Sequence, residues 1–97
     1  MSIFSYIMRM FDPDSVESFK SSLDDYYSWP ATFPFKFIVP IEQANQVIEL
    51  IDDPNLTSRP STNGRYRAFS LDKIVHSSDE VVAVYIKMNL IPGIISI

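Results

Sequence analysis

The side chains best suited to nucleophilic catalysis gather around the single histidine of the chain. Ser70, Asp72, His76 and Ser77 supply the residue types of a Ser-His-Asp unit, in which the histidine takes the proton of an attacking serine. The surrounding sequence has neither a Gly-x-Ser-x-Gly elbow nor a glycine-rich loop for an oxyanion. We therefore interpret His76 as a structural or solvent-exposed loop residue.

Two pairs of neighbouring aspartates are the other candidates for hydrolytic or metal chemistry. Asp24-Asp25 and Asp52-Asp53 each lie near the end of an expected helix, and we interpret both pairs as solvated surface. With one histidine and no cysteine, the chain lacks the usual nitrogen and sulfur ligands of a zinc site. We expect no metal, no cofactor and no enzymatic activity.

A basic stretch, RPSTNGRYRAFS, is the strongest candidate for a binding site. It places Arg59, Arg65, Tyr66 and Arg67 around an Asn-Gly pair in a chain whose net charge is −4. This local positive charge favours contact with an acidic partner or a small anion. The simpler interpretation is that these residues solubilise an exposed hairpin and discourage pairing at its edge.

Two different turns fit this hairpin. A two-residue type I′ turn at Asn-Gly pairs Arg59 with Ala68 and puts Pro60 at a hydrogen-bonded position opposite Arg67. A three-residue turn with a glycine bulge moves Pro60 to a non-hydrogen-bonded position and sets Arg59 opposite Arg67. We favour the bulged turn, because a missing backbone donor costs more than two solvated guanidinium groups.

The positioning elements begin with an apolar segment, MSIFSYIMRMF, which we assign to an N-terminal extension over residues 1–11. It is shorter than the roughly 20 apolar residues that span a bilayer. Its basic residue, Arg9, follows the apolar run, whereas a secretory signal carries its charge first. We expect no membrane association, and a native translation start at Met10 is an alternative.

Residues 12–34 read as a leading helix and a proline-containing linker. Asp12 is a good N-cap residue, and Pro13 suits the first helical position. Pro30 and Pro34 then exclude a continuing helix.

Alternation and helical spacing predict the elements of residues 35–97. They are a strand at 35–39, a helix at 41–52, strands near 56–60 and 65–75, a helix capped by Ser77 and Glu80, and a strand at 93–97. The first helix has an expected buried stripe of Ile41, Ala44, Val47, Ile48 and Ile51. The second has one of Val81, Val84, Tyr85 and Met88.

This order predicts an α+β fold, a ferredoxin-like βαββαβ two-layer sandwich with an extra N-terminal helix. Right-handed crossovers place the first and third strands in the middle of the sheet and the second and fourth at its edges. Both helices then cover one face of the sheet. The other face and the apolar final strand are available to a protein partner or to a second copy of the chain.

Binding of RNA needs a separate test, because RNA-recognition motifs share this element order. Such sheets stack bases on aromatic side chains of their central strands. Here Phe35 and Phe37 share the face that we expect to meet helices, while Lys36 and Ile38 point the other way. Only Tyr66 remains as an exposed stacking candidate. The acidic net charge also argues against affinity for phosphates, and we do not expect nucleic-acid binding.

Three motifs, WPATFPFKFIVP, RPSTNGRYRAFSL and IPGIISI, resemble the YbeD-like family of small bacterial proteins, a domain of unknown function. The similarity covers about residues 15–97. Arg59 replaces the usual lysine of the hairpin motif, and Ala68-Phe69 replaces the usual Ser-Val.

The resemblance implies a ferredoxin-like fold similar to regulatory domains of the ACT type. It suggests a small regulatory or protein-interaction module, or else a sensor of a small organic acid such as lipoate, with RNA binding ranked last. The absence of cysteine fits the reducing cytoplasm, where we expect the protein.

Overall fold

The computed structural model describes residues 13–96, so the N-terminal extension, the N-cap expected at Asp12 and the last residue lie outside the described part. Within it, the chain is α+β, with three α-helices and a four-stranded antiparallel sheet. In order, the elements are α2 (Pro13–Tyr26), β1 (Ala31–Pro40), the 3-10 helix η1 (Ile41–Gln43), α3 (Ala44–Ile51), β2 (Thr57–Pro60), β3 (Tyr66–Val75), α4 (Ser78–Met88) and β4 (Ile95–Ser96).

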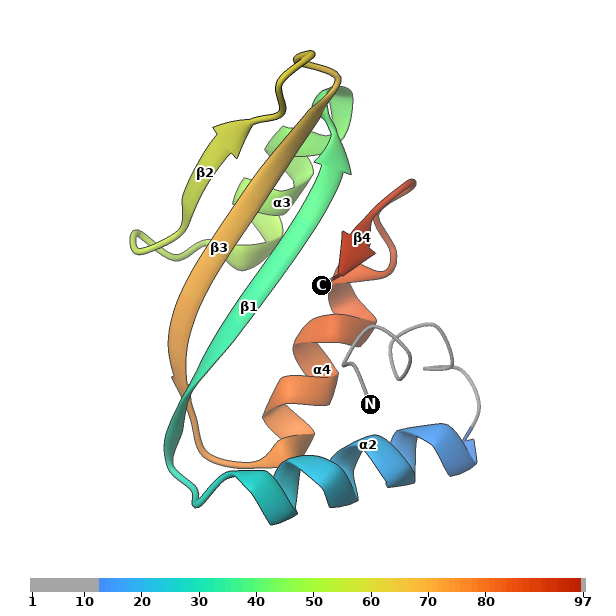
Figure 1. Ribbon diagram of the computed structural model, residues 1–97, viewed down its shortest axis with the longest axis vertical. Helices are drawn as coiled ribbons and strands as arrows, with labels where there is room; N and C mark the ends of the chain where they lie inside the picture. The colour runs from blue at the N-terminus through green and yellow to red at the C-terminus, as the bar shows by residue number, and fades with distance from the viewer. Residues whose placement is uncertain (1–12, 97) are drawn as a thin grey trace.

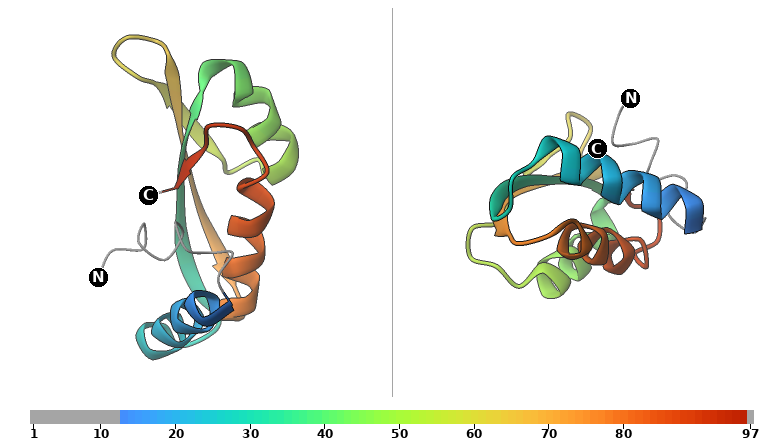
Figure 2. Two further views of the ribbon diagram at one scale, coloured as in Figure 1. Left: turned by 90° about the vertical axis from the view of Figure 1, so that its right-hand side faces the viewer. Right: turned by 90° about the horizontal axis from the view of Figure 1, so that it is seen from below.

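The strand order is β2-β3-β1-β4, which confirms that the first and third strands lie in the middle. Helices α3 and α4 cover the same face of the sheet, and α2 crosses the end of the sheet beside α4 (Figures 1 and 2). Lys20 of α2 and Asp79 of α4 form an ion pair of 2.7 Å. The hydrogen bond to Asp79 raises the pKa of Lys20. The leading helix is thereby attached to the body of the fold.

Alternating side chains of the two central strands build the core. Phe33, Phe35, Phe37 and Val39 of β1 and Phe69, Leu71 and Val75 of β3 are buried on the helix side. They meet Tyr85 of α4, which is fully buried. The stripe expected for α4 is confirmed, since Val81, Tyr85 and Met88 are buried and Val84 packs partly buried against the core. Ser77 caps α4 by accepting a hydrogen bond from the Glu80 N–H at 3.3 Å, as the capping pattern predicts.

Strand β1 is longer than predicted. It begins at Ala31, so the linker ends at Pro30 and Pro34 lies inside the strand, opposite Asp72. The Ile41 N–H donates a hydrogen bond to the Arg65 carbonyl. Because hydrogen-bonded positions alternate along an antiparallel pair, the backbone N–H and C=O groups of odd-numbered β1 residues point toward β3. Even-numbered Pro34 faces the other edge, where, within residues 13–96, β4 pairs only with Phe37 and Ile38. The missing N–H of Pro34 thus breaks no bond to β3, which is why the strand continues through it.

The buried stripe expected for helix 41–52 is partly wrong. Ile41 and Ile48 are 43% and 51% exposed, whereas Val47 is buried and Leu50 packs against the core. Ile41 lies in the 3-10 turn Ile41–Gln43, before the α-helix begins at Ala44, whereas Ala44 and Ile51 of the expected stripe pack partly buried against the core. The helix ends at Asp52, which adopts a left-handed conformation with φ of 46°.

A candidate binding site on the open sheet face

The register of three strands determines which side chains share the face away from α3 and α4. Lys36 of β1, Ser70 of β3 and Thr57 of β2 form one row across the sheet. The next row consists of Ile38, Ala68 and Arg59. Ile95 of β4 adjoins Ile38. No helix within residues 13–96 covers this surface (Figure 2), which we call the open face.

The hairpin register differs from the one we favoured. Arg59 pairs with Ala68 and Pro60 pairs with Arg67, as in the alternative that we did not choose. The Ser61 N–H bonds the Tyr66 carbonyl at 2.9 Å, so the Pro60 pair falls at a non-hydrogen-bonded position. Pro60 therefore loses no hydrogen bond to β3, although the hairpin does not adopt the register of the bulged turn.

The turn explains how Arg59 can pair with Ala68 while Pro60 stays at a non-hydrogen-bonded position. The Gly64 N–H bonds the Ser61 carbonyl, and Gly64 has φ of +73°, a conformation that favours glycine. The Ser61 hydroxyl accepts from the Tyr66 N–H and donates to Asn63 Oδ1. Asn63 Oδ1 also accepts from the Arg65 N–H at 3.1 Å. Side chains thus replace backbone acceptors, and the loop holds four residues between its closing pair.

This register separates the arginines that the sequence placed together. Arg59 lies on the open face because it is paired with Ala68, and Tyr66 lies there because it is two residues from Ala68 on β3. Arg67 faces the other side, where its Nε donates to Ser58 Oγ at 2.9 Å. Arg65 lies in the loop. The four candidate residues therefore do not form a single anion-binding cluster.

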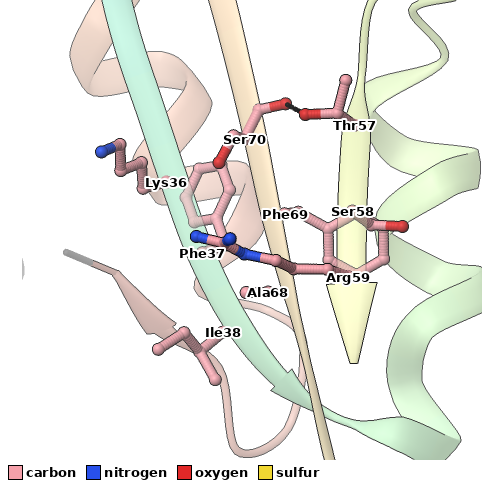
Figure 3. Close-up of a pocket in the computed structure, with 9 residues that line it drawn as sticks. All are labelled: Lys36, Phe37, Ile38, Thr57, Ser58, Arg59, Ala68, Phe69 and Ser70. Carbon is pink, nitrogen blue, oxygen red and sulfur yellow. Dashed lines mark hydrogen bonds between the residues drawn. The ribbon is translucent and has the colours of Figure 1, made fainter. Parts of the chain in front are cut away.

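A shallow trough of about 650 Å³ occupies the open face around Arg59 (Figure 3). Its floor is low because Ala68 and Ser70 on β3 are small, whereas Lys36 and Arg59 on the flanking strands are long. Arg59 extends from β2 across β3 toward β1 (Figure 3). Neither cation makes an ion pair with any described residue. The trough thus offers two unpaired positive charges above a small, partly apolar surface.

Sequence reasoning did not reveal that Lys36 lines the same trough as Arg59. The outward direction of Lys36 follows from alternation along its strand, but its distance from Arg59 depends on the register across β3. Thr57 and Ser70 were missed for the same reason. The Thr57 hydroxyl donates to the Ser70 carbonyl at 3.3 Å, and the Ser70 hydroxyl lines the trough.

The residues of the hypothetical Ser-His-Asp unit are occupied in other ways. His76 Nδ1 lies 3.5 Å from Glu80 Oε1, and its backbone N–H donates to Glu80 Oε2. Ser77 is the cap of α4. Ser70 and Asp72 alternate onto the open face, away from the N-terminus of α4. Among residues 13–96, no hydrogen bond joins a serine hydroxyl to the imidazole of His76.

The paired acids also have local partners. Asp24 accepts a hydrogen bond from the Trp29 indole at 2.9 Å, and Asp53 accepts one from the Asn55 N–H at 2.8 Å. Within residues 13–96, no three histidine, aspartate or glutamate side chains are grouped to hold a metal ion. The helices of this same part of the chain are too short or too polar to cross a bilayer.

Comparisons with known proteins agree with the motifs of the sequence. The profile of the family described as "Protein of unknown function (DUF493)" matches residues 24–97. A UPF0250 protein of Shewanella loihica is 30% identical over 73 residues, which cover 68% of this chain and 83% of that protein. No solved structure is significantly similar. The chain belongs to the DUF493 family of unknown function, the YbeD-like family that its motifs resemble.

Proposed function

We propose that the protein is a non-enzymatic module of ferredoxin-like arrangement that docks a protein partner on its open face. The arrangement is supported by the βαββαβ order and by the positions of β1 and β3 between β2 and β4. A role in the cytoplasm is consistent with the absence of cysteine.

The docking proposal is carried by one observation: Lys36 and Arg59 form no ion pair with a described residue, and they lie beside exposed apolar side chains. Ile95 and Tyr66 are 44% and 41% exposed on the same face. An exposed apolar surface with charges at its border is typical of a protein interface. A partner with acidic side chains fits this face best.

Capture from native lysate tests this proposal. The double variant Lys36→Glu/Arg59→Glu should lose a partner that the wild type retains. Arg65→Glu/Arg67→Glu is the matched control, because it makes the same change of charge outside the open face. Equal loss in both variants would show that net charge alone governs capture. Retention by the first variant would contradict the proposal.

A small organic acid is the second candidate occupant. Its support is the trough itself, in which two cations and the Ser70 hydroxyl surround a small floor. Thermal shift measurements with lipoate, octanoate and amino acids test for it. An acid bound there should raise the unfolding temperature of the wild type and have little effect on Arg59→Ala. A second copy of the chain remains the alternative protein partner, and sedimentation of the purified protein distinguishes it.

A further inference from the structure

A second site lies on the opposite side of the sheet, between α3 and α4. A slot of about 50 Å³ is lined by Phe35 and Leu71 of the sheet, Leu50 of α3 and Val84 of α4. Ile51 of α3 and the two lysines Lys73 and Lys87 complete its lining. The slot is therefore apolar at its base and carries two cations.

The position of Lys73 shows that the helical layer is incomplete here. Lys73 has the same parity on β3 as buried Leu71 and Val75, so it points to the helix side of the sheet. It is nevertheless exposed, because neither α3 nor α4 covers it. A lysine at this position keeps its ammonium group in water and its stem on apolar surface.

The charges at the slot lack partners. Neither Lys73 nor Lys87 forms an ion pair with a described residue. By contrast, Lys20 pairs with Asp79 at 2.7 Å. Two cations that line an apolar opening and lack a described ion-pair partner favour a ligand that combines an aliphatic group with carboxylates.

The size of the slot decides what kind of ligand fits. Sites for small molecules usually measure roughly 300–1,000 Å³, and this one is far smaller. Its volume suits a single aliphatic side chain, as in the anchor pockets of protein interfaces. We infer that the slot accepts one leucine-sized side chain from an acidic segment of a protein partner, with flanking carboxylates contacting Lys73 and Lys87.

Amide correlation spectra of the full chain test this inference with short peptides. Acetyl-EELEE-amide should shift the signals of Leu50, Val84 and Lys87. Acetyl-EEAEE-amide, which lacks the anchor, and acetyl-KKLKK-amide, which reverses the charge, should shift them much less. Lys73→Glu/Lys87→Glu should weaken binding of the first peptide about tenfold. Val84→Phe, which fills the slot, should abolish it.

The control variant is Lys36→Glu/Arg59→Glu, which makes the same charge change on the open face and should leave the peptide affinity unchanged. If Val84→Phe does not fold, the lysine reversal still decides the question. Equal shifts with EELEE and EEAEE, or no effect of the lysine reversal, would overturn the inference. Equal shifts with isovalerate alone would also overturn it, because a small acid would then be the occupant. Loss of partner capture at the open face has no bearing on these outcomes.

Discussion

Arg59 lies directly opposite Ala68 across β2 and β3, and this pairing creates the trough of the open face. The small side chain of Ala68 leaves room for the Arg59 guanidinium to extend over β3 (Figure 3). One residue further along β3, Arg67 points to the other side of the sheet and bonds Ser58. The position of each arginine along its strand therefore determines which face of the sheet its side chain occupies.

Filling the trough should abolish binding there without unfolding the protein. Ala68→Leu places a larger side chain beneath Arg59, where the alanine is only partly buried. We expect loss of partner capture and of any thermal shift by organic acids. The free energy of unfolding should change by less than about 0.5 kcal/mol, as is usual at surface positions. Ala83→Leu, at an exposed position on α4, is the matched control. Binding that survives Ala68→Leu would locate the site elsewhere.

The hydroxyl of Tyr85 should lower the stability of the folded state. The side chain is fully buried among Phe33, Phe35 and Phe37, and its oxygen has no hydrogen-bond partner among residues 13–96. Tyr85→Phe keeps the ring contacts and removes the unsatisfied group. We expect the free energy of unfolding in urea to rise by about 1 kcal/mol. A decrease of that size would reveal a partner for the hydroxyl, such as a buried water. Tyr66→Phe, at an exposed position, should have little effect.

Burial of Tyr85 also predicts sensitivity to alkali. Desolvation raises the pKa of its phenol well above the ordinary value of 10.0, so the folded state holds a proton that the unfolded state releases. Stability from this group is fully present below about pH 10 and decreases as pH rises beyond it. Tyr85→Phe should flatten this decrease. Burial raises the pKa of Tyr27 as well, so some decrease should remain. Identical slopes in unfolding titrations of both proteins would contradict the assignment.

The main elements of the fold were predictable because their signals are local. Alternation identified the buried face of β1 and β3, and helical spacing together with a serine cap identified α4. The stripe of α3 was only partly predictable, because Ile41 lies in a 3-10 turn that precedes the α-helix. No propensity of single residues distinguishes that start from an ordinary helix.

The candidate site was less predictable because it depends on cross-strand register. The hairpin register follows from Ser61, whose hydroxyl accepts the Tyr66 N–H, and alternation alone does not reveal such a bond. In the observed register Arg59 lies opposite Ala68 rather than Arg67, and it lines the trough together with Lys36. Pro34 was misjudged for a related reason. A proline interrupts a strand only where its missing N–H faces a partner, and that direction is known only after the strands are paired.

Pro34 should prevent a strand of another chain from pairing with the exposed edge of β1. Its backbone faces the edge of β1 that β4 does not cover within the described part of the chain. Pro60 protects the β2 edge in the same way, because the position of its missing N–H faces away from β3. Edge prolines of this kind prevent pairing with other chains. We expect Pro34→Thr to restore a donor and to shift sedimentation profiles toward dimers or larger species as concentration rises.

Thr32→Val is the matched control for this change. Thr32 lies two residues before Pro34 on β1, with the same parity. Its substitution increases apolar and β-branched character at the edge without adding an N–H donor. We therefore expect Thr32→Val to sediment like the wild type at concentrations where Pro34→Thr associates. Association of both variants would point to apolar contact, and association of neither would show that another part of the chain protects the β1 edge.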